Sequence, residues 1–238
     1  MTRADGRKYN ELRDVTITPD FNKFAEGSVL IRCGDTVVLC TASVEEKVPP
    51  HVKPGCGWVT AEYSMLPRAN RERSRRDVDK LKLSGRSAEI QRLIGRSLRA
   101  AVDMKLLGER TVTIDCDVLQ GDGGTRTASV TGGFVALALA CRKLLAEGKV
   151  MRDPIIHQVA AVSAGIIDEV PVLDLPYSED SRAQVDLNCV MNEKGELIEL
   201  QGTGEGRSFT LSEQQELVRL CAKGIRELME KQREILRR

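Results

Sequence analysis

Aromatic side chains, histidines and long apolar runs are all scarce or missing in this 238-residue sequence. Phe, Trp and Tyr together make up 3% of the residues, which favours recognition of a nucleic-acid backbone over stacking of bases on an aromatic platform. The two histidines, His51 and His157, stand in no recognisable Ser-His-acid motif, so a histidine base is not expected. No apolar run approaches the length of a membrane span. The polar N-terminus lacks the apolar core of a secretory signal, so we expect a cytoplasmic protein with no membrane partner.

Excess charge and paired cysteines are lacking as well. With 36 Lys and Arg against 35 Asp and Glu, the formal net charge is +1, so any affinity for nucleic acid must come from local clusters. The seven cysteines form no CxxC pair, and several lie in apolar runs, which favours buried free thiols over disulfides or zinc. The length suits one mixed α/β unit, so a single domain over residues 1–238 is expected.

Apolar periodicity and turn residues predict an alternation of strands and helices. Strands are expected at 14–18, 28–44 (a hairpin turning at 33–35), 57–63, 111–120, 155–172 and 184–191. Helices are expected at 86–103, at 126–146, and from a Ser212–Gln215 capping box toward the C-terminus. Residues 64–82 contain almost no apolar side chains and predict an exposed, mobile loop. The order of elements predicts an α+β fold with mixed sheets flanked by helices.

A glycine-rich turn, GDGGT at 121–125, connects a predicted strand to the helix 126–146. Glycines let backbone N–H groups converge on an anion, and the helix N-terminus adds partial positive charge. Thr125 adds a hydroxyl and Arg126 a planar fork of donors. These residues predict a phosphate-binding turn, although it is neither a P-loop nor a GxGxxG fingerprint. A tight turn that simply needs glycine is the alternative.

Arginines supply two further candidate sites. Arg86 follows Ser84-Gly85 at a helix N-terminus, where a cation opposes the macrodipole unless an anion is bound, so it is a candidate partner for the same phosphate. A solvated arginine at a loop edge is the alternative. The loop carries five more arginines, which predict a grip on the RNA backbone, with a solvated loop or a subunit contact as alternatives. These five are Arg68, Arg71, Arg73, Arg75 and Arg76.

An acidic segment at 179–188 contains Asp180 and Asp186. In an extended strand, Asp186 shares one face with Gln184 and Asn188, so its carboxylate would be presented outward while the other face is buried. Oxygen ligands suit Mg²⁺, and a carboxylic acid can protonate a leaving hydroxyl. An ordinary amphipathic edge strand would produce the same pattern.

These four features in this order, with RADGRKYNELR at the N-terminus, resemble the ribonuclease PH family across nearly the whole chain. The resembling segments are 3–13, 33–44, 62–68, 84–90, 115–132, 179–188 and 202–208. The resemblance implies a βαβα-type α+β domain and phosphorolysis. In that reaction inorganic phosphate attacks the 3′-terminal phosphodiester and releases a nucleoside diphosphate, and the reverse nucleotide-adding reaction is possible. Transfer RNA precursors are the usual substrates of the family.

The same resemblance implies roles and an assembly. Arg86, Gly124, Thr125 and Arg126 would hold the attacking phosphate, Asp180 and Asp186 would serve Mg²⁺ binding or proton transfer, and the loop 68–76 would grip RNA. A homohexamer, a trimer of dimers around a central hole, is implied as well. Two other classes stay open: a non-catalytic RNA-binding ring subunit, and a hydrolytic two-metal nuclease, which would want a denser acidic cluster.

Overall fold

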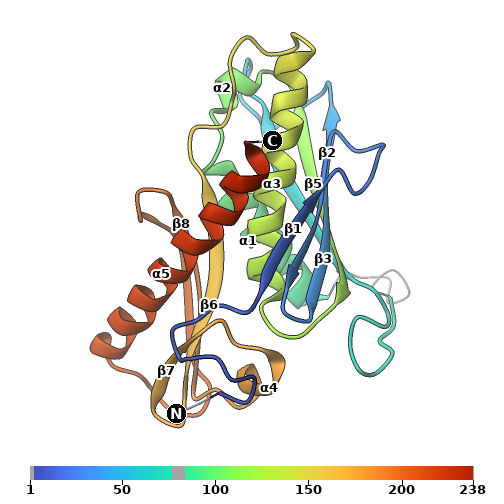
Figure 1. Ribbon diagram of the computed structural model, residues 1–238. Coiled ribbons are helices and arrows are strands. Elements are labelled where there is room, and N and C mark those ends of the chain that lie inside the picture. Colours follow the sequence, from blue (N-terminus) through green and yellow to red (C-terminus); the bar gives the residue numbers. More distant parts are fainter. Residues whose placement is uncertain (1–2, 77–83, 238) are drawn as a thin grey trace.

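The computed structural model describes residues 3–76 and 84–237, which form two β-sheets with a long helix between them (Figure 1). The first sheet has the strand order β1-β2-β3-β5-β4. Strands β4 and β5 are parallel and the other neighbours are antiparallel, so this sheet is mixed. Its strands are β1 (Val15–Pro19), β2 (Gly27–Cys33), β3 (Thr36–Glu45), β4 (Trp58–Met65) and β5 (Thr111–Gln120).

The second sheet is antiparallel throughout and has the order β7-β6-β8-β9. Its central strands β6 and β8 are almost fully buried, β7 is buried in its second half, and β9 is mostly half-buried or exposed. Its strands are β6 (Val159–Ile167), β7 (Val170–Leu173), β8 (Val185–Asn192) and β9 (Leu197–Gly204). The predicted α+β class with mixed sheets and flanking helices is therefore confirmed.

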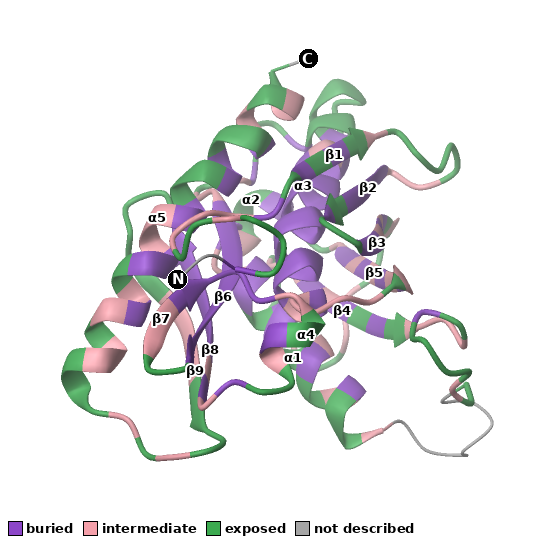
Figure 2. Cartoon of the chain, turned by 60° about the horizontal axis from the view of Figure 1, so that its bottom comes forward, coloured by how far each residue is buried: buried purple, intermediate pink, exposed green. Residues whose placement is uncertain are grey.

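Five helices accompany the sheets in the described part of the chain: α1 (Gly85–Arg99), α2 (Met104–Leu107), α3 (Thr125–Ala146), α4 (Tyr177–Asp180) and α5 (Leu211–Leu236). The central helix α3 is buried between the two sheets (Figure 2). Small residues let the sheet approach it closely, because a Cβ at Gly27 of β2 would collide with the backbone of Ala136. A Cβ at Gly132 would meet Ile31 at 2.8 Å. The glycines and alanines of α3 thus set the separation of the layers.

Helix α3 also corrects the expectation that no apolar run approaches a membrane span. Its 22 residues are long and apolar enough to cross a membrane by length and composition. In the fold, 78% of that apolar window is buried inside the protein. The run is explained by its position between two sheets, where a helix is apolar on all sides.

One hydrophobic core joins both sheets. A single cluster of buried side chains includes Ile31 and Val38 of the first sheet, Phe134 of α3, and Leu187 and Val190 of the second sheet. The cysteines are free thiols, six of them buried, while Cys56 is half-buried. This agrees with the expected buried thiols.

Two predicted helix boundaries are wrong. The helix predicted to reach residue 103 ends at Arg99, because Val102 pairs with Ile155 in an isolated bridge and the Asp103 N–H donates to the Pro154 carbonyl. The capping box of α5 is Thr210–Glu213 rather than Ser212–Gln215. Thr210 has extended backbone angles and accepts from the Glu213 N–H, whereas Ser212 already lies inside the helix.

Candidate active site

The glycine-rich turn lies between the end of β5 and the N-terminus of α3, as predicted. Gly123 and Gly124 have φ values of 73° and 65°, in the left-handed region that glycine adopts at little cost. No side chain caps the helix at Gly124, and the first turn of α3 contains no acidic residue. The N-terminal N–H groups and the positive end of the dipole are therefore available to an anion.

Thr125 is oriented by a buried tyrosine that the sequence analysis did not single out. The Tyr63 hydroxyl and Thr125 Oγ1 are 2.8 Å apart and share a hydrogen bond. Burial raises the pKa of Tyr63, although the bond to Thr125 and the charges of Arg86 and Arg126 act in the opposite direction. A neutral tyrosine therefore holds the threonine hydroxyl at the entrance of helix α3.

Arg126 and Arg86 approach the turn from two different helices. Arg126 is half-buried, and its Nη1 donates to Gln201 Oε1 of β9 at 3.0 Å. Arg86 is exposed in the first turn of α1. Neither guanidinium forms an ion pair with an acid within residues 3–76 and 84–237. Most of their donors are consequently free to bind an anionic ligand.

Asp180 and Asp186 come from the second sheet and its short helix α4. Asp186 Oδ2 accepts a hydrogen bond from Asn188 Nδ2 at 3.1 Å. Its Oδ1 is buried and has no hydrogen-bond partner among the described residues. Asp186 is half-buried between buried Val185 and Leu187, as the predicted alternation requires, and its carboxylate lines a cavity and not an open surface.

Burial and nearby charges shift the pKa of both carboxyl groups. Burial raises the pKa of Asp186 to about 6, and the negative charge of Asp180 contributes in the same direction. Burial also raises the pKa of Asp180, against the charges of Arg86 and Arg126, which lower it. The arginines and aspartates are thus close enough to act on one another electrostatically.

One cavity of about 970 Å³ brings these groups together. All four predicted phosphate-binding residues and both aspartates line it, although they come from three helices, α1, α3 and α4, and from strand β8. They are Arg86, Gly124, Thr125, Arg126, Asp180 and Asp186. Exposed Glu205 also lines the cavity, and its charge raises the pKa of both aspartates. One cavity thus combines donors that suit an anion with two carboxyl groups that can bind a proton or a cation that prefers oxygen ligands.

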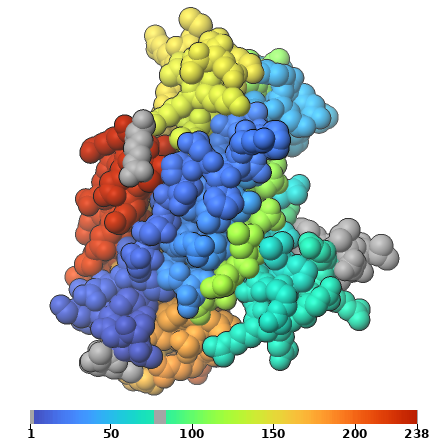
Figure 3. All heavy atoms as spheres, turned by 45° about the vertical axis from the view of Figure 1, so that its right-hand side comes forward, coloured from blue at the N-terminus to red at the C-terminus, as the bar shows by residue number. Residues whose placement is uncertain are grey.

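The arginine loop is only partly in contact with this cavity. Arg71 and Arg73 line it, whereas Arg68, Arg75 and Arg76 are exposed and do not. The loop projects from the body of the molecule in Figure 3, in teal. It is anchored at buried Ala69, whose carbonyl accepts from the Gly121 N–H at 2.8 Å. Residues 77–82 of the predicted loop lie outside the described residues.

Two protein-family models match the chain and show to which family it belongs. The 3′ exoribonuclease family, domain 1, matches residues 11–143, and domain 2 of the same family matches residues 157–223. The chain belongs to this family. It is 55% identical to the ribonuclease PH of Syntrophomonas wolfei subsp. wolfei over 237 residues, 99% of each chain. The predicted membership of the ribonuclease PH family is confirmed.

Solved structures share the fold at lower identity. Rice (Oryza sativa) Rrp46 is 17% identical with a TM-score of 0.80, over 98% of this chain and 100% of that one. A chain of the Archaeoglobus fulgidus exosome with RNA bound to the active site is 24% identical with a TM-score of 0.81, over 96% and 92%. A chain of an archaeal exosome core is 24% identical with a TM-score of 0.76, over 97% and 91%. At these identities the similarity concerns the fold alone.

Several residues of the site were missed by the sequence reasoning. Tyr63 lies in the segment 62–68 and Glu205 in the segment 202–208, both of which carried the family resemblance without an assigned role. Gln201 and Tyr177 had no such signal. Tyr177 is 57% exposed and lines the cavity. Their contribution depends on the packing of α4 and β9 beside the glycine-rich turn, which no local pattern reveals.

Proposed function

We propose that this family member is a phosphate-dependent 3′→5′ exoribonuclease that trims transfer RNA precursors, and that Arg86, Gly124, Thr125 and Arg126 hold the attacking phosphate. The observation that carries the proposal is that a glycine-rich turn at a helix N-terminus, two arginines and two acids line one cavity. The attacking phosphate and the scissile phosphodiester are both anions, so the site must hold them together against their repulsion. Arginine donors and a helix N-terminus provide that stabilisation.

The proposed reaction is an exchange of one P–O bond for another. An oxygen of inorganic phosphate forms a bond to the phosphorus of the 3′-terminal nucleotide, and the bond from that phosphorus to the preceding 3′ oxygen breaks. The leaving oxygen takes up a proton, so the RNA ends in a new 3′ hydroxyl and a nucleoside diphosphate departs. Asp180 and Asp186 are the acids next to this reaction, and they serve proton transfer or metal binding.

The acidic side of the cavity also fits Mg²⁺. The buried Asp186 Oδ1 has no hydrogen-bond partner among the described residues, and carboxylate oxygens are suitable ligands for a hard cation. No group of three His, Cys, Asp or Glu side chains that could hold a metal occurs within residues 3–76 and 84–237. Mg²⁺ held by Asp180 and Asp186 would therefore complete its shell with water and phosphate oxygens, and it would neutralise charge between the two phosphates.

Substrate capture is assigned to the arginine loop. Arg71 and Arg73 at the cavity would contact phosphates near the 3′ end, while Arg68, Arg75 and Arg76 would contact the RNA farther away. Contacts of this kind recognise the backbone and not the base sequence. They suit an enzyme that removes successive nucleotides of different identity.

The released nucleotide tests the activity directly. With a transfer RNA precursor and inorganic phosphate, we expect nucleoside diphosphates, and no release when phosphate is omitted. Nucleoside monophosphates formed without phosphate would establish a hydrolase instead. No release under either condition would establish a non-catalytic RNA-binding subunit.

The proposed active form is a cytoplasmic homohexamer, a trimer of dimers, in which each chain folds as one unit. The shared hydrophobic core supports one folding unit, and the archaeal exosome core shows that a chain of this fold is part of a larger complex. We expect light scattering to give six times the chain mass of 26.3 kDa. A stable, active monomer would contradict the hexamer and leave the proposed chemistry of the cavity untouched.

A further inference from the structure

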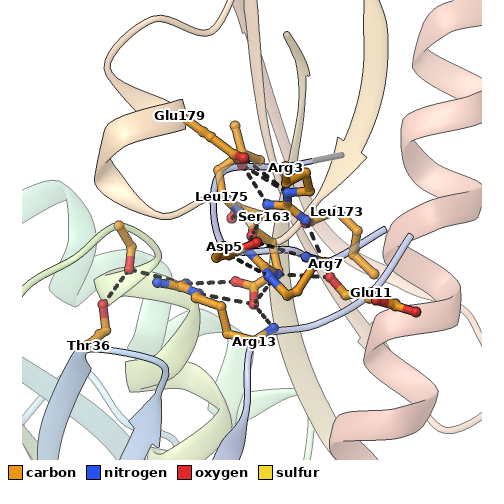
Figure 4. Close-up of polar contacts among 12 residues, drawn as sticks. Arg3, Asp5, Arg7, Glu11, Arg13, Thr36, Ser163, Leu173, Leu175 and Glu179 are labelled. Carbon is orange, nitrogen blue, oxygen red and sulfur yellow. Dashed lines mark hydrogen bonds and ion pairs between the residues drawn. The ribbon is translucent and has the colours of Figure 1, made fainter. Parts of the chain in front are cut away.

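A buried arginine near the N-terminus connects the glycine-rich turn to the second sheet (Figure 4). The Arg13 side chain is 6% exposed. Its Nη1 donates to the Asp122 carbonyl at 2.5 Å and its Nη2 to the Gly123 carbonyl at 3.4 Å. The same guanidinium donates to both carboxylate oxygens of Asp174, at 2.7 and 3.1 Å. Arg13 therefore contacts the backbone carbonyls of the proposed phosphate-binding turn without itself lining the cavity.

Its partner Asp174 begins the segment that leads to the acids. Asp174 is 5% exposed and has a φ of 53°, an unusual conformation for a residue with a side chain. Its N–H donates to the Ser163 carbonyl of β6 at 2.7 Å. Burial would raise the pKa of Asp174, but the charge and hydrogen bonds of Arg13 outweigh burial and lower it. The pair is thus charged and buried, and Arg7 Nη1 lies 3.6 Å from Asp174 Oδ2 as a second cation on the same carboxylate.

A second group holds the turn from the first sheet. Thr36 Oγ1 donates to the Gly123 carbonyl at 2.7 Å and accepts from the Asp122 N–H at 2.9 Å. Gly124 approaches Arg13 so closely that a Cβ there would lie 2.9 Å from Nη2. The carbonyls of Asp122 and Gly123 are consequently fixed between Arg13 and Thr36.

Because peptide groups are planar, these contacts to carbonyl oxygens also determine the directions of the neighbouring N–H groups. The chain has no cis peptide bond in its described part, so each carbonyl points opposite to the N–H of the next residue. Fixing the carbonyl of Asp122 therefore fixes the N–H of Gly123. Fixing the carbonyl of Gly123 fixes the N–H of Gly124. An arginine that never touches the ligand thereby sets the direction of donors at the entrance of α3.

We propose that Arg13 is a positioning residue that aims the N–H groups of Gly123 and Gly124 at the phosphate and holds this turn in register with the segment carrying Asp180. The inference rests on the proposed function of the turn. Since Arg13 is paired with Asp174 and contacts the turn through backbone carbonyls, its proposed effect is on the geometry of the turn and not through contact with the phosphate. A merely structural role would change stability and leave phosphate affinity untouched.

Arg13→Lys separates the two roles, because lysine keeps the charge but cannot donate to two carbonyls and two carboxylate oxygens at once. We expect the Kd for inorganic phosphate, measured by calorimetry without RNA, to rise at least about tenfold. The Kd for RNA without phosphate should change less than about twofold. In turnover, the KM for phosphate should rise while kcat at saturating phosphate changes little.

Two companion variants make the comparison decisive. Thr36→Val removes the hydrogen bond from Thr36 to the Gly123 carbonyl and should raise the phosphate Kd about threefold. It also provides the test if Arg13→Lys does not fold. Arg99→Lys is the matched control, because Arg99 donates to the Val59 carbonyl and lies over the Trp58 ring, with no contact to the turn. It should reduce stability without changing the phosphate Kd.

Normal phosphate affinity in Arg13→Lys, or in Thr36→Val if the first variant is unfolded, would overturn this inference alone. Equal weakening in Arg99→Lys would overturn it too, because general loosening of the fold would then explain the effect. Failure of the unmodified protein to bind phosphate would overturn the proposed function of the turn together with the inference.

Discussion

Two sets of arginines in this chain show how pairing decides what a guanidinium does. Arg3 and Arg13 have side chains only 3% and 6% exposed, and each is bonded to a buried carboxylate and to backbone carbonyls. Arg86 and Arg126 lie at the cavity and form no ion pair within the described part of the chain. The first set has used its donors in holding the fold together. The second keeps them for a ligand.

Two neighbouring acids repeat the contrast. Glu179 is 4% exposed and accepts hydrogen bonds from Arg3 Nε and Nη2, the latter at 2.5 Å. Asp180, the next residue, lines the cavity, and burial raises its pKa. One short helix therefore presents one carboxylate to the interior and one to the active site.

Removing a buried arginine should have the largest effect, and the affected quantity should be the free energy of unfolding. Arg3→Met leaves the buried Glu179 carboxylate without its ion-pair partner, which costs about 3 to 5 kcal/mol of unfolding free energy. Urea unfolding of the variant and the unmodified protein measures the difference. The control Lys8→Met removes an exposed cation, 79% exposed, and should change stability by less than about 0.5 kcal/mol. Equal stability of all three proteins would show that burial and pairing do not distinguish the two sets.

Removing an arginine that lines the cavity should instead lower the rate of phosphorolysis. Arg126→Ala is expected to lower phosphorolysis at least about 10²-fold, the scale for losing one preorganised donor at an anionic transition state. Its unfolding free energy should change little, because Gln201 supplies its one hydrogen bond in the described part of the chain. Initial rates with saturating RNA provide the measurement. Near-normal phosphorolysis would remove Arg126 from the phosphate site.

The raised pKa of Asp186 predicts a pH dependence of Mg²⁺ binding. With a pKa of about 6, the group is neutral below that pH and charged above it, and only the charged form binds the cation. Affinity should therefore increase as pH rises toward 6, by up to about tenfold per unit, and level off above it. Because the pKa in the folded protein exceeds the ordinary aspartate value of 3.8, this group's contribution to stability should also fall as pH rises from 3.8 toward 6.

Calorimetric titration with Mg²⁺ at several pH values, without RNA, tests this dependence. Asp186→Asn should bind the ion weakly at every pH and lose the trend. Asp180→Asn removes the neighbouring negative charge that raises the pKa of Asp186, so any remaining trend should shift to lower pH. An unchanged pH profile in Asp186→Asn would assign the titration to another group.

The smallest effects are expected from the loop, where the cavity-lining and outlying arginines can be compared. For every arginine that binds a phosphate, neutralisation should reduce the log–log salt slope of RNA binding by roughly 0.7 to 0.9. Arg71→Gln with Arg73→Gln should raise the KM of both long and short RNA. Neutralising Arg68, Arg75 and Arg76 should raise the KM of a transfer RNA precursor alone. If both variants change the KM of the long and the short RNA equally, the arginines that line the cavity and those outside it do not differ in function.

Local chemistry was sufficient for much of the fold and for half of the site. The strand 111–120 agrees with β5, and the turn at 33–35 agrees with the β2–β3 hairpin, because alternation and glycine act over a few residues. The glycine-rich turn, proposed here to bind phosphate, was recognisable as a candidate for the same reason, since Gly124, Thr125 and Arg126 are adjacent in sequence. The missed helices α2 and α4 have four residues each, too short for any periodicity to appear.

By itself, the sequence determined which side chains were available: arginines, glycines and aspartates in an order that resembles one family. Tertiary structure alone decided which of them are free to react. Arg13 meets Asp174 across 161 residues, and Arg3 meets Glu179 across 176, while Arg126 of α3 and Asp186 of β8 line one cavity. Arginines look alike along the chain. Packing separates them, because a buried charge must find a partner and only an unpaired one keeps its donors for a ligand.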